Sequence, residues 1–154
     1  MKKNLSHIGV DNRPSMVDVS HKPQQKRTAV AEGFIELKSE TLQLINENRI
    51  KKGNVLLTAE LAGIGAAKKT SDLIPLCHPL QLSKIDVKAE PQERGIRITG
   101  TVICTGQTGV EMEALSAVST ALLTIYDMCK AVDTEMVISS VKLISKIKEC
   151  EKRQ

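Results

Sequence analysis

The chain has 154 residues, of which 41% are hydrophobic and 26% are charged, and its formal net charge is +4. These values fit one soluble globular domain with a sizeable core, and the modest positive charge suits an anionic small molecule as partner. Phe34 and Tyr126 are the two aromatic residues, too few to form the stacking platforms that single-strand binders use, so we expect no nucleic acid partner.

Location and metal content are also constrained by composition. The first residues are basic but no apolar run follows them, which predicts no secretory signal, and the uncharged stretch 114–126 is too short to cross a bilayer. The cysteines form no C-x-x-C pair: Cys77, Cys104, Cys129 and Cys150. We expect a cytoplasmic protein without membrane association, with reduced and mostly buried thiols, no metal site and no required cofactor.

The first third of the chain contains one predicted strand and two predicted helices. Residues 1–27 are polar and basic and predict an extended arm. Loose alternation over 28–38 predicts a strand, and from Ser39 the apolar spacing changes to that of a helix ending near Arg49. After a turn, Asn54 can cap a second helix that is rich in small residues and can pack closely.

A stiff linker over 71–80 follows this helix. Pro75 and Pro79 fix their own backbone angles and push the residue before each towards an extended conformation. Cys77 and His78 are therefore held on a rigid loop. A lone histidine is more often structural than catalytic, but one placed between two prolines is a better functional candidate than most.

The second half predicts a hairpin, a long helix and a last strand. Alternating apolar residues mark strands at 82–90 and 96–104, and residues 136–147 form another strand. The catalytic domain is expected to cover 28–148, with a loose tail over 149–154.

The helix over 108–130 organises the rest of the chain. Thr108 and Glu111 have the spacing of a capping box, and the uncharged segment inside the helix is apolar on every face, which predicts burial all round. Asp127 stands near the helix C-terminus, where a carboxylate opposes the helix dipole, and Lys130 follows at i+3. This pair favours a functional site, although a purely structural helix remains the alternative.

The order of elements predicts an α+β fold. It matches the β-α-β-β-α-β pattern of a ferredoxin-like sandwich, with helices on one face of an antiparallel sheet. The other face of such a sheet needs a cover, which suggests an oligomer.

Six motifs, in unbroken order over about 16–147, resemble those of the cyclic pyranopterin monophosphate synthase family, the C protein family of molybdenum cofactor biosynthesis. Position 107 holds Gln where the family pattern has Lys. The motifs are M-V-D-V-S at 16–20, K-G-N at 52–54, A-G-I-G-A-A-K-K-T at 62–70, D-L-I-P-L-C-H-P-L at 72–80, Q-T-G-V-E-M-E-A-L at 107–115 and L-T-I-Y-D-M-C-K-A-V at 123–132.

The resemblance implies a lyase that converts 3′,8-cyclo-7,8-dihydroguanosine 5′-triphosphate to cyclic pyranopterin monophosphate and releases pyrophosphate. By motif, Asp127 and Lys130 are implied to be catalytic, with Lys52 as a further acid or base. The implied substrate-binding residues are Leu76, Cys77, His78, Glu111, Met112 and Glu113, with Arg27 and Lys146 at the phosphates. Mg²⁺ could accompany the triphosphate, because such ions bind mainly to substrate oxygens.

The residue types suit this chemistry. Lysines with partly desolvated ammonium groups can act as acids or bases near neutral pH, carboxylates accept the paired N–H groups of a guanidine-like edge, and basic side chains neutralise departing pyrophosphate. The chain departs from the family pattern after Lys146, where relatives have a K-S-G-G-K-S-G type segment and this chain has I-K-E-C-E-K-R-Q. A non-catalytic nucleotide-binding module and a structural oligomer are the competing interpretations.

The two ends of the long helix are expected to serve one site. Glu113 and Lys130 are seventeen positions apart, which is roughly 25 Å along a helix axis. We therefore expect a site shared between subunits, with Glu113, His78 and Lys52 from one chain meeting Asp127 and Lys130 from its neighbour. The expected assembly is an obligate dimer within a hexamer, arranged as a trimer of dimers.

Overall fold

The computed structural model describes residues 13–149. Its elements follow the predicted order, with one short additional helix, α3, where the linker was expected to begin. They are β1 (Gln25–Glu36), α1 (Ser39–Asn46), α2 (Val55–Lys68), α3 (Thr70–Leu73), β2 (Leu82–Gln92), β3 (Gly95–Gly106), α4 (Glu111–Cys129) and β4 (Val137–Glu149).

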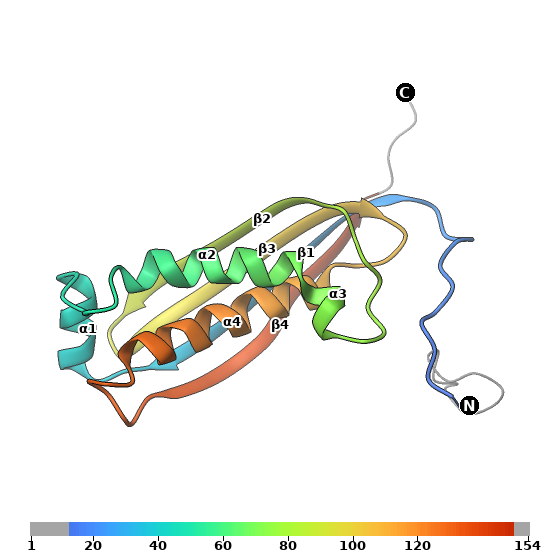
Figure 1. The fold of residues 1–154 in the computed structure, drawn as a ribbon. Coiled ribbons are helices and arrows are strands. Elements are labelled where there is room, and N and C mark those ends of the chain that lie inside the picture. The colour runs from blue at the N-terminus through green and yellow to red at the C-terminus, as the bar shows by residue number, and fades with distance from the viewer. Residues whose placement is uncertain (1–12, 150–154) are drawn as a thin grey trace, which may run out of the picture.

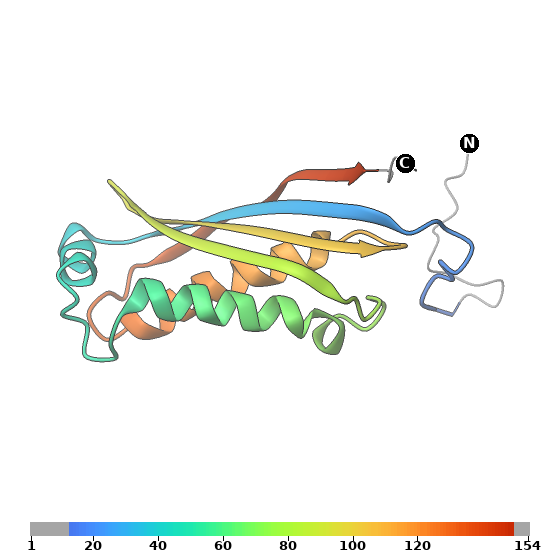
Figure 2. The same ribbon diagram turned by 90° about the horizontal axis from the view of Figure 1, so that it is seen from above.

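The four strands form one sheet in the order β2-β3-β1-β4, and every neighbouring pair is antiparallel. Helices α2 and α4 lie side by side on one face of this sheet, and no described element covers the other face (Figures 1 and 2). The predicted ferredoxin-like α+β fold is confirmed.

Strand β1 shows why the helices pack on this face. Its residues alternate between buried and partly buried, so that Ala29, Ala31, Gly33 and Ile35 face the core. A Cβ at Gly33 would come within 2.7 Å of Leu122 Cδ1 on α4. The small residues therefore allow the helix to approach the centre of the sheet closely.

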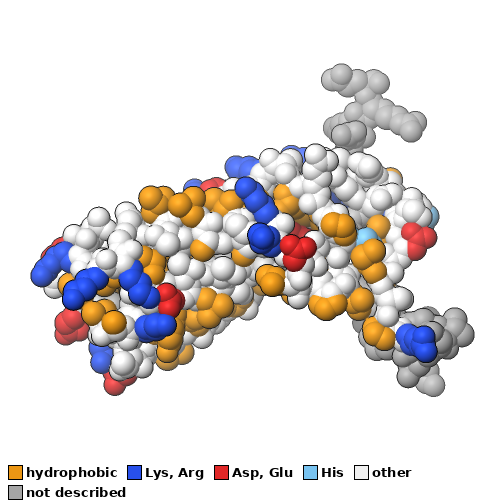
Figure 3. Space-filling view, viewed as in Figure 1, with side chains coloured by type: hydrophobic (Ala, Val, Ile, Leu, Met, Phe, Trp, Pro, Cys, Tyr) orange, Lys and Arg blue, Asp and Glu red, His pale blue; other side chains and the backbone are white. Residues whose placement is uncertain are grey.

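Helix α4 is buried on one side, not all round as predicted. Its inner side chains, which include Ala117, Val118 and Ile125, are fully buried, whereas Leu123 is 59% exposed and Tyr126 is 37% exposed. The two-layer fold covers α4 with the sheet and α2 and leaves its outer face open. Apolar side chains are visible across the helix-bearing face in Figure 3.

The predicted capping box at the start of α4 is wrong. The helix begins at Glu111, the N-cap position is Val110, and no side chain caps it. Glu111 instead pairs with Lys146 on β4, with its Oε1 3.3 Å from the lysine Nζ. The Glu111 carboxylate therefore pairs with a residue distant in sequence, instead of accepting a hydrogen bond from the backbone of Thr108 as a capping box requires.

The other boundaries differ little from prediction. Helix α1 ends at Asn46 rather than near Arg49, since Asn48 adopts a left-handed φ of 53°. The predicted cap at Asn54 is confirmed, because its side chain accepts a hydrogen bond from Leu57 N at 3.0 Å. Strand β4 runs to Glu149, which forms an ion pair with Lys26.

Residues 1–12 of the predicted arm and 150–154 of the predicted tail, including Cys150, lie outside the described residues. Across residues 13–149, none of the helices combines the length and apolar character needed to cross a membrane.

Candidate active site

Two lysines meet one carboxylate at the C-terminal end of α4. Lys52 Nζ donates to Asp127 Oδ2 and to the backbone carbonyl of Asp127, both at 2.8 Å, and Lys130 Nζ lies 2.7 Å from Asp127 Oδ1. All three side chains are about half exposed. Each carboxylate oxygen therefore holds a different ammonium group at the protein surface.

The turn between α1 and α2 presents Lys52 to this carboxylate. Gly53 adopts a φ of 106°, a left-handed conformation that favours glycine, and its N–H closes the turn on the carbonyl of Ile50. Ile50 is buried and Asn54 caps α2, so both ends of the turn are fixed. Local sequence thus fixes the turn, and the packing of α2 against α4 brings Lys52 to Asp127.

The ion pairs change the proton affinities of this cluster. Hydrogen bonds from Lys130 and then from Lys52, together with their positive charges, lower the pKa of Asp127 to about 2. The hydrogen bond to Asp127 in turn raises the pKa of Lys130. Near neutral pH Asp127 is therefore a carboxylate and Lys130 is an ammonium ion. In this state Lys130 can donate a proton and can stabilise negative charge.

Asp133, which sequence reasoning missed, fixes the chain just after this cluster. Its carboxylate is buried and accepts hydrogen bonds from Lys38 N, from the Thr41 hydroxyl and from Glu135 N. Burial alone would raise the pKa of Asp133, but these donors and the Lys38 charge outweigh it and the pKa is lowered. Lys38 precedes Asp133 by 95 positions, and no spacing rule connects them.

A cavity of about 420 Å³ lies at the other end of α4. Residues of the arm form part of its wall, among them Val17, Val19 and Lys22. Six of the eight residues implied to bind substrate line it: Leu76, Cys77, His78, Glu111, Met112 and Glu113. The proline-stiffened loop and the first turn of α4 therefore meet as the motifs implied.

Glu113 is the most buried polar residue of this cavity, with 4% of its surface exposed. Burial raises its pKa, and the neighbouring charge of Glu111 adds to this effect. Burial also raises the pKa of the Cys77 thiol, and the charge of Glu113 raises it further. The cavity therefore favours a protonated thiol and a carboxyl group that can accept or donate a proton nearer neutral pH than an ordinary glutamate.

A smaller, basic cavity of about 110 Å³ adjoins the first one, since Glu111 and Gly109 line both. Arg27 and Lys146 line it as expected, and so does Lys148, which pairs with Arg27 in the register of β1 and β4. Arg27 Nη2 donates to Gln107 O at 3.3 Å, while its Nε is buried without a hydrogen-bond partner among residues 13–149. The site can neutralise an anion. Lys148 could have been predicted from the sequence, because residues two positions apart on a strand, such as Lys146 and Lys148, face the same side.

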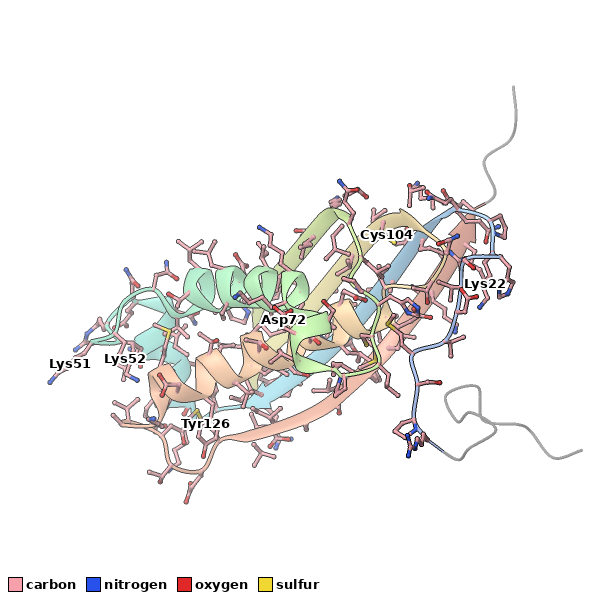
Figure 4. The ribbon with its side chains drawn as sticks, turned by 45° about the vertical axis from the view of Figure 1, so that its right-hand side comes forward. Lys22, Lys51, Lys52, Asp72, Cys104 and Tyr126 are labelled. Atoms are coloured by element: carbon pink, nitrogen blue, oxygen red, sulfur yellow. The ribbon has the colours of Figure 1, made fainter. Side chains whose placement is uncertain are left out.

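The two groups of residues are separated by the length of α4. Lys52 lies at one end of the molecule, whereas Lys22 and Cys104 lie at the other end (Figure 4). The expected grouping is wrong for Lys52, because it contacts Asp127 of its own chain rather than standing with Glu113 and His78. One chain therefore carries two separate groups of candidate residues: Lys52, Asp127 and Lys130 at one end, and His78, Glu113 and the cavities at the other.

Between residues 13 and 149, no three or more His, Cys, Asp and Glu side chains come together in a way that could hold a metal ion.

Comparison with known proteins identifies the family. The sequence profile described as "MoaC family" matches residues 16–149, which is most of the chain. The chain belongs to the MoaC family. Within it, a relative from Brevibacillus brevis named cyclic pyranopterin monophosphate synthase is 56% identical over 147 residues, covering 95% of this chain and 92% of the relative. Membership in the MoaC family agrees with the resemblance drawn from the six motifs.

Proposed function

We propose that this member of the MoaC family is a lyase of molybdenum cofactor biosynthesis, a cyclic pyranopterin monophosphate synthase. It converts 3′,8-cyclo-7,8-dihydroguanosine 5′-triphosphate to cyclic pyranopterin monophosphate and releases pyrophosphate. The 56% identity to a relative with that name supports the assignment. So does the family match over residues 16–149, which includes both groups of candidate residues. The enzyme acts in the cytoplasm.

The observation that carries the proposal is the convergence of Lys52 and Lys130 on Asp127. A binding module needs cations for phosphates but has no need of a carboxylate that holds two ammonium groups in fixed positions. Asp127 orients both lysines, and the lysines supply protons to a rearranging ring and neutralise developing negative charge. The non-catalytic nucleotide-binding module is not favoured, since the relative is named a synthase.

The lysines are not desolvated in a single chain. Lys52 and Lys130 are 48% and 59% exposed, and the pKa of Lys130 is raised rather than lowered. A lysine can act as a base near neutral pH when its pKa is lowered, for example by removal of its ammonium group from water. A neighbouring subunit that covers this end of α4 would provide such an environment.

The cavity at the other end suits the substrate. Glu111 and Glu113 can accept the N–H groups of the guanidine-like edge, and His78 lines the same cavity. Arg27, Lys146 and Lys148 can neutralise the triphosphate in the adjoining basic cavity, with or without Mg²⁺ on its oxygens. No cofactor of the protein's own is needed for this chemistry.

We therefore propose a composite site in which Lys52, Asp127 and Lys130 of one subunit face His78 and Glu113 of its neighbour. An isologous dimer would contain two such sites, and three dimers would form a hexamer. Exposed apolar residues on both layers support an assembly: Leu57, Leu61, Leu123 and Tyr126 on the helices, and Val141, Ile144 and Ile147 on β4.

The direct test is to incubate the protein with the cyclised nucleotide and to measure pyrophosphate and the cyclic phosphate product. Lys130→Ala is the matched control, because it removes one exposed side chain of the cluster. Stoichiometric release of both products by the wild type, and not by the control, is expected. Tight binding of the nucleotide without turnover would refute the proposed activity.

A further inference from the structure

The arm is attached to the body of the protein through Gln107. Its side-chain nitrogen donates to the backbone carbonyls of Ser20 and Lys22, both at 3.1 Å, and its backbone carbonyl accepts from Arg27 Nη2 at 3.3 Å. Gln107 stands in the loop between β3 and α4, directly before the cavity-lining residues of the first helical turn. Gln107 therefore connects the arm to the body of the protein: its side-chain amide holds the arm, and its backbone carbonyl holds Arg27 on β1.

The same segment of the arm contacts His78. The ring Nε2 lies 2.7 Å from the carbonyl of Val17. A carbonyl oxygen can only accept a hydrogen bond, so Nε2 must carry a proton in this arrangement, and in neutral imidazole Nδ1 is then the nitrogen that can take up a proton.

Residues 17–22 thus have two effects on the cavity. They supply Val17, Val19 and Lys22 to its wall, and they fix the ring orientation and the proton position of His78. Residues 13–24 of the arm are themselves mostly exposed.

We propose that Gln107 is a positioning residue for the reaction: by holding the carbonyls of Ser20 and Lys22 it keeps the arm over the cavity and His78 in its Nε2-protonated orientation. This inference deepens the proposed function and rests on it for the kinetic consequence. The structural consequence, an ordered arm hydrogen-bonded to His78, is independent of the reaction.

The donor character of residue 107 is what matters. Both groups that it meets on the arm are carbonyls, so a side chain with N–H groups is required. The family motif has Lys at this position, which is also a donor of sufficient length. Gln107→Lys should therefore retain the arm, Gln107→Ala should release it, and Gln107→Glu should repel it by placing a carboxylate against two carbonyl oxygens.

The experiment compares these variants with Gln43→Ala. Gln43 also uses its side-chain amide, donating to Glu47 at 2.8 Å, but on α1 far from the cavity. Two measurements do not depend on activity. One is amide hydrogen exchange at Lys22, whose N–H is bonded to Val19 O, and the other is the imidazole Nε2–H resonance of His78, assigned by its loss in His78→Ala.

Gln107→Ala and Gln107→Glu are expected to lose protection at Lys22 and to lose the His78 Nε2–H signal to exchange with water. With the cyclised nucleotide, KM should rise and kcat/KM should fall by roughly tenfold or more, since two hydrogen bonds of ordinary strength are removed. Gln107→Lys should keep the protection at Lys22, the His78 signal, KM and kcat/KM close to their wild-type values, and Gln43→Ala should change none of them.

Unchanged exchange and an unchanged His78 signal in Gln107→Ala would overturn the proposal. A fall in kcat at constant KM with an intact His78 signal would also overturn it, because a smaller amount of folded enzyme gives that result without any change in the position of the arm. If the wild type releases no pyrophosphate, the proposed function fails, and the exchange and resonance measurements still decide whether Gln107 holds the arm.

Discussion

Inactive subunits should complement one another if the site spans two chains. The structure sorts the residues by position along α4: Glu113 and His78 line the cavity at its first turn, whereas Lys52 and Lys130 meet Asp127 at its last turn. Glu113→Ala removes one half of a composite site and leaves the other half intact. Lys130→Ala does the reverse, so the two lesions are separable in a mixed assembly.

The recovered activity follows from this geometry. When equal amounts of the two variants are unfolded and refolded together, each site receives an intact first half with a probability of one half and an intact second half with the same probability. About a quarter of the wild-type rate of pyrophosphate release should therefore return. The fraction is the same for a dimer and for a hexamer built from three dimers, because each site involves two chains.

A second mixture provides the control. Lys52 and Lys130 lie in the same half, so hybrids of Lys52→Ala with Lys130→Ala should stay inactive, with a lesion in every site. Activity recovered in this mixture would contradict the placement of Lys52 beside Asp127. Absence of recovery in the Glu113→Ala and Lys130→Ala mixture, with hybrids identified by mass, would mean that the site lies within one chain.

Three further predictions concern single variants. Asp127→Ala and Lys130→Ala should abolish pyrophosphate release and leave the melting temperature nearly unchanged, because both side chains are more than half exposed and pack against little. His78→Ala should also lose activity, with a change in melting temperature of less than the few degrees that about 1 kcal/mol would produce. Burial raises the pKa of Glu113, so the folded state binds its proton more tightly than the unfolded chain. The contribution of Glu113 to stability is therefore full below its ordinary pKa of 4.5 and is lost as the pH rises through the raised value, so Glu113→Gln should melt at a higher temperature than wild type near pH 7 and at a similar temperature below pH 4.5.

Each of these outcomes has a clear opposite. Near-normal turnover in either Asp127→Ala or Lys130→Ala would exclude the cluster from catalysis. A drop of several degrees in His78→Ala, with full activity per folded molecule, would make His78 a structural residue. A melting-temperature difference between Glu113→Gln and wild type that does not vary with pH would show that the Glu113 carboxyl titrates alike in folded and unfolded chains.

The sequence determined the elements and named candidate residues that the structure gathers into two groups. Apolar residues recurring with a period of two or of about 3.6 located the four strands and the three longer helices that the structure describes. These periods arise because each element buries one side against its neighbours. The pair Asp127 and Lys130 was readable for the same reason, as i and i+3 positions meet on any helix. The motifs around His78 and Glu113 named the residues that line the cavity.

Contacts between distant residues were decided only by the tertiary structure. Glu111 pairs with Lys146 instead of capping α4, Asp133 holds Lys38 and Thr41, and Gln107 holds the arm, because in each case the partner lies on another element. Lys52 was assigned to the wrong half for the same reason. Its neighbour Asp127 is 75 positions away, and only the antiparallel packing of α2 against α4, with the turn at Gly53, brings the start of one helix to the end of the other.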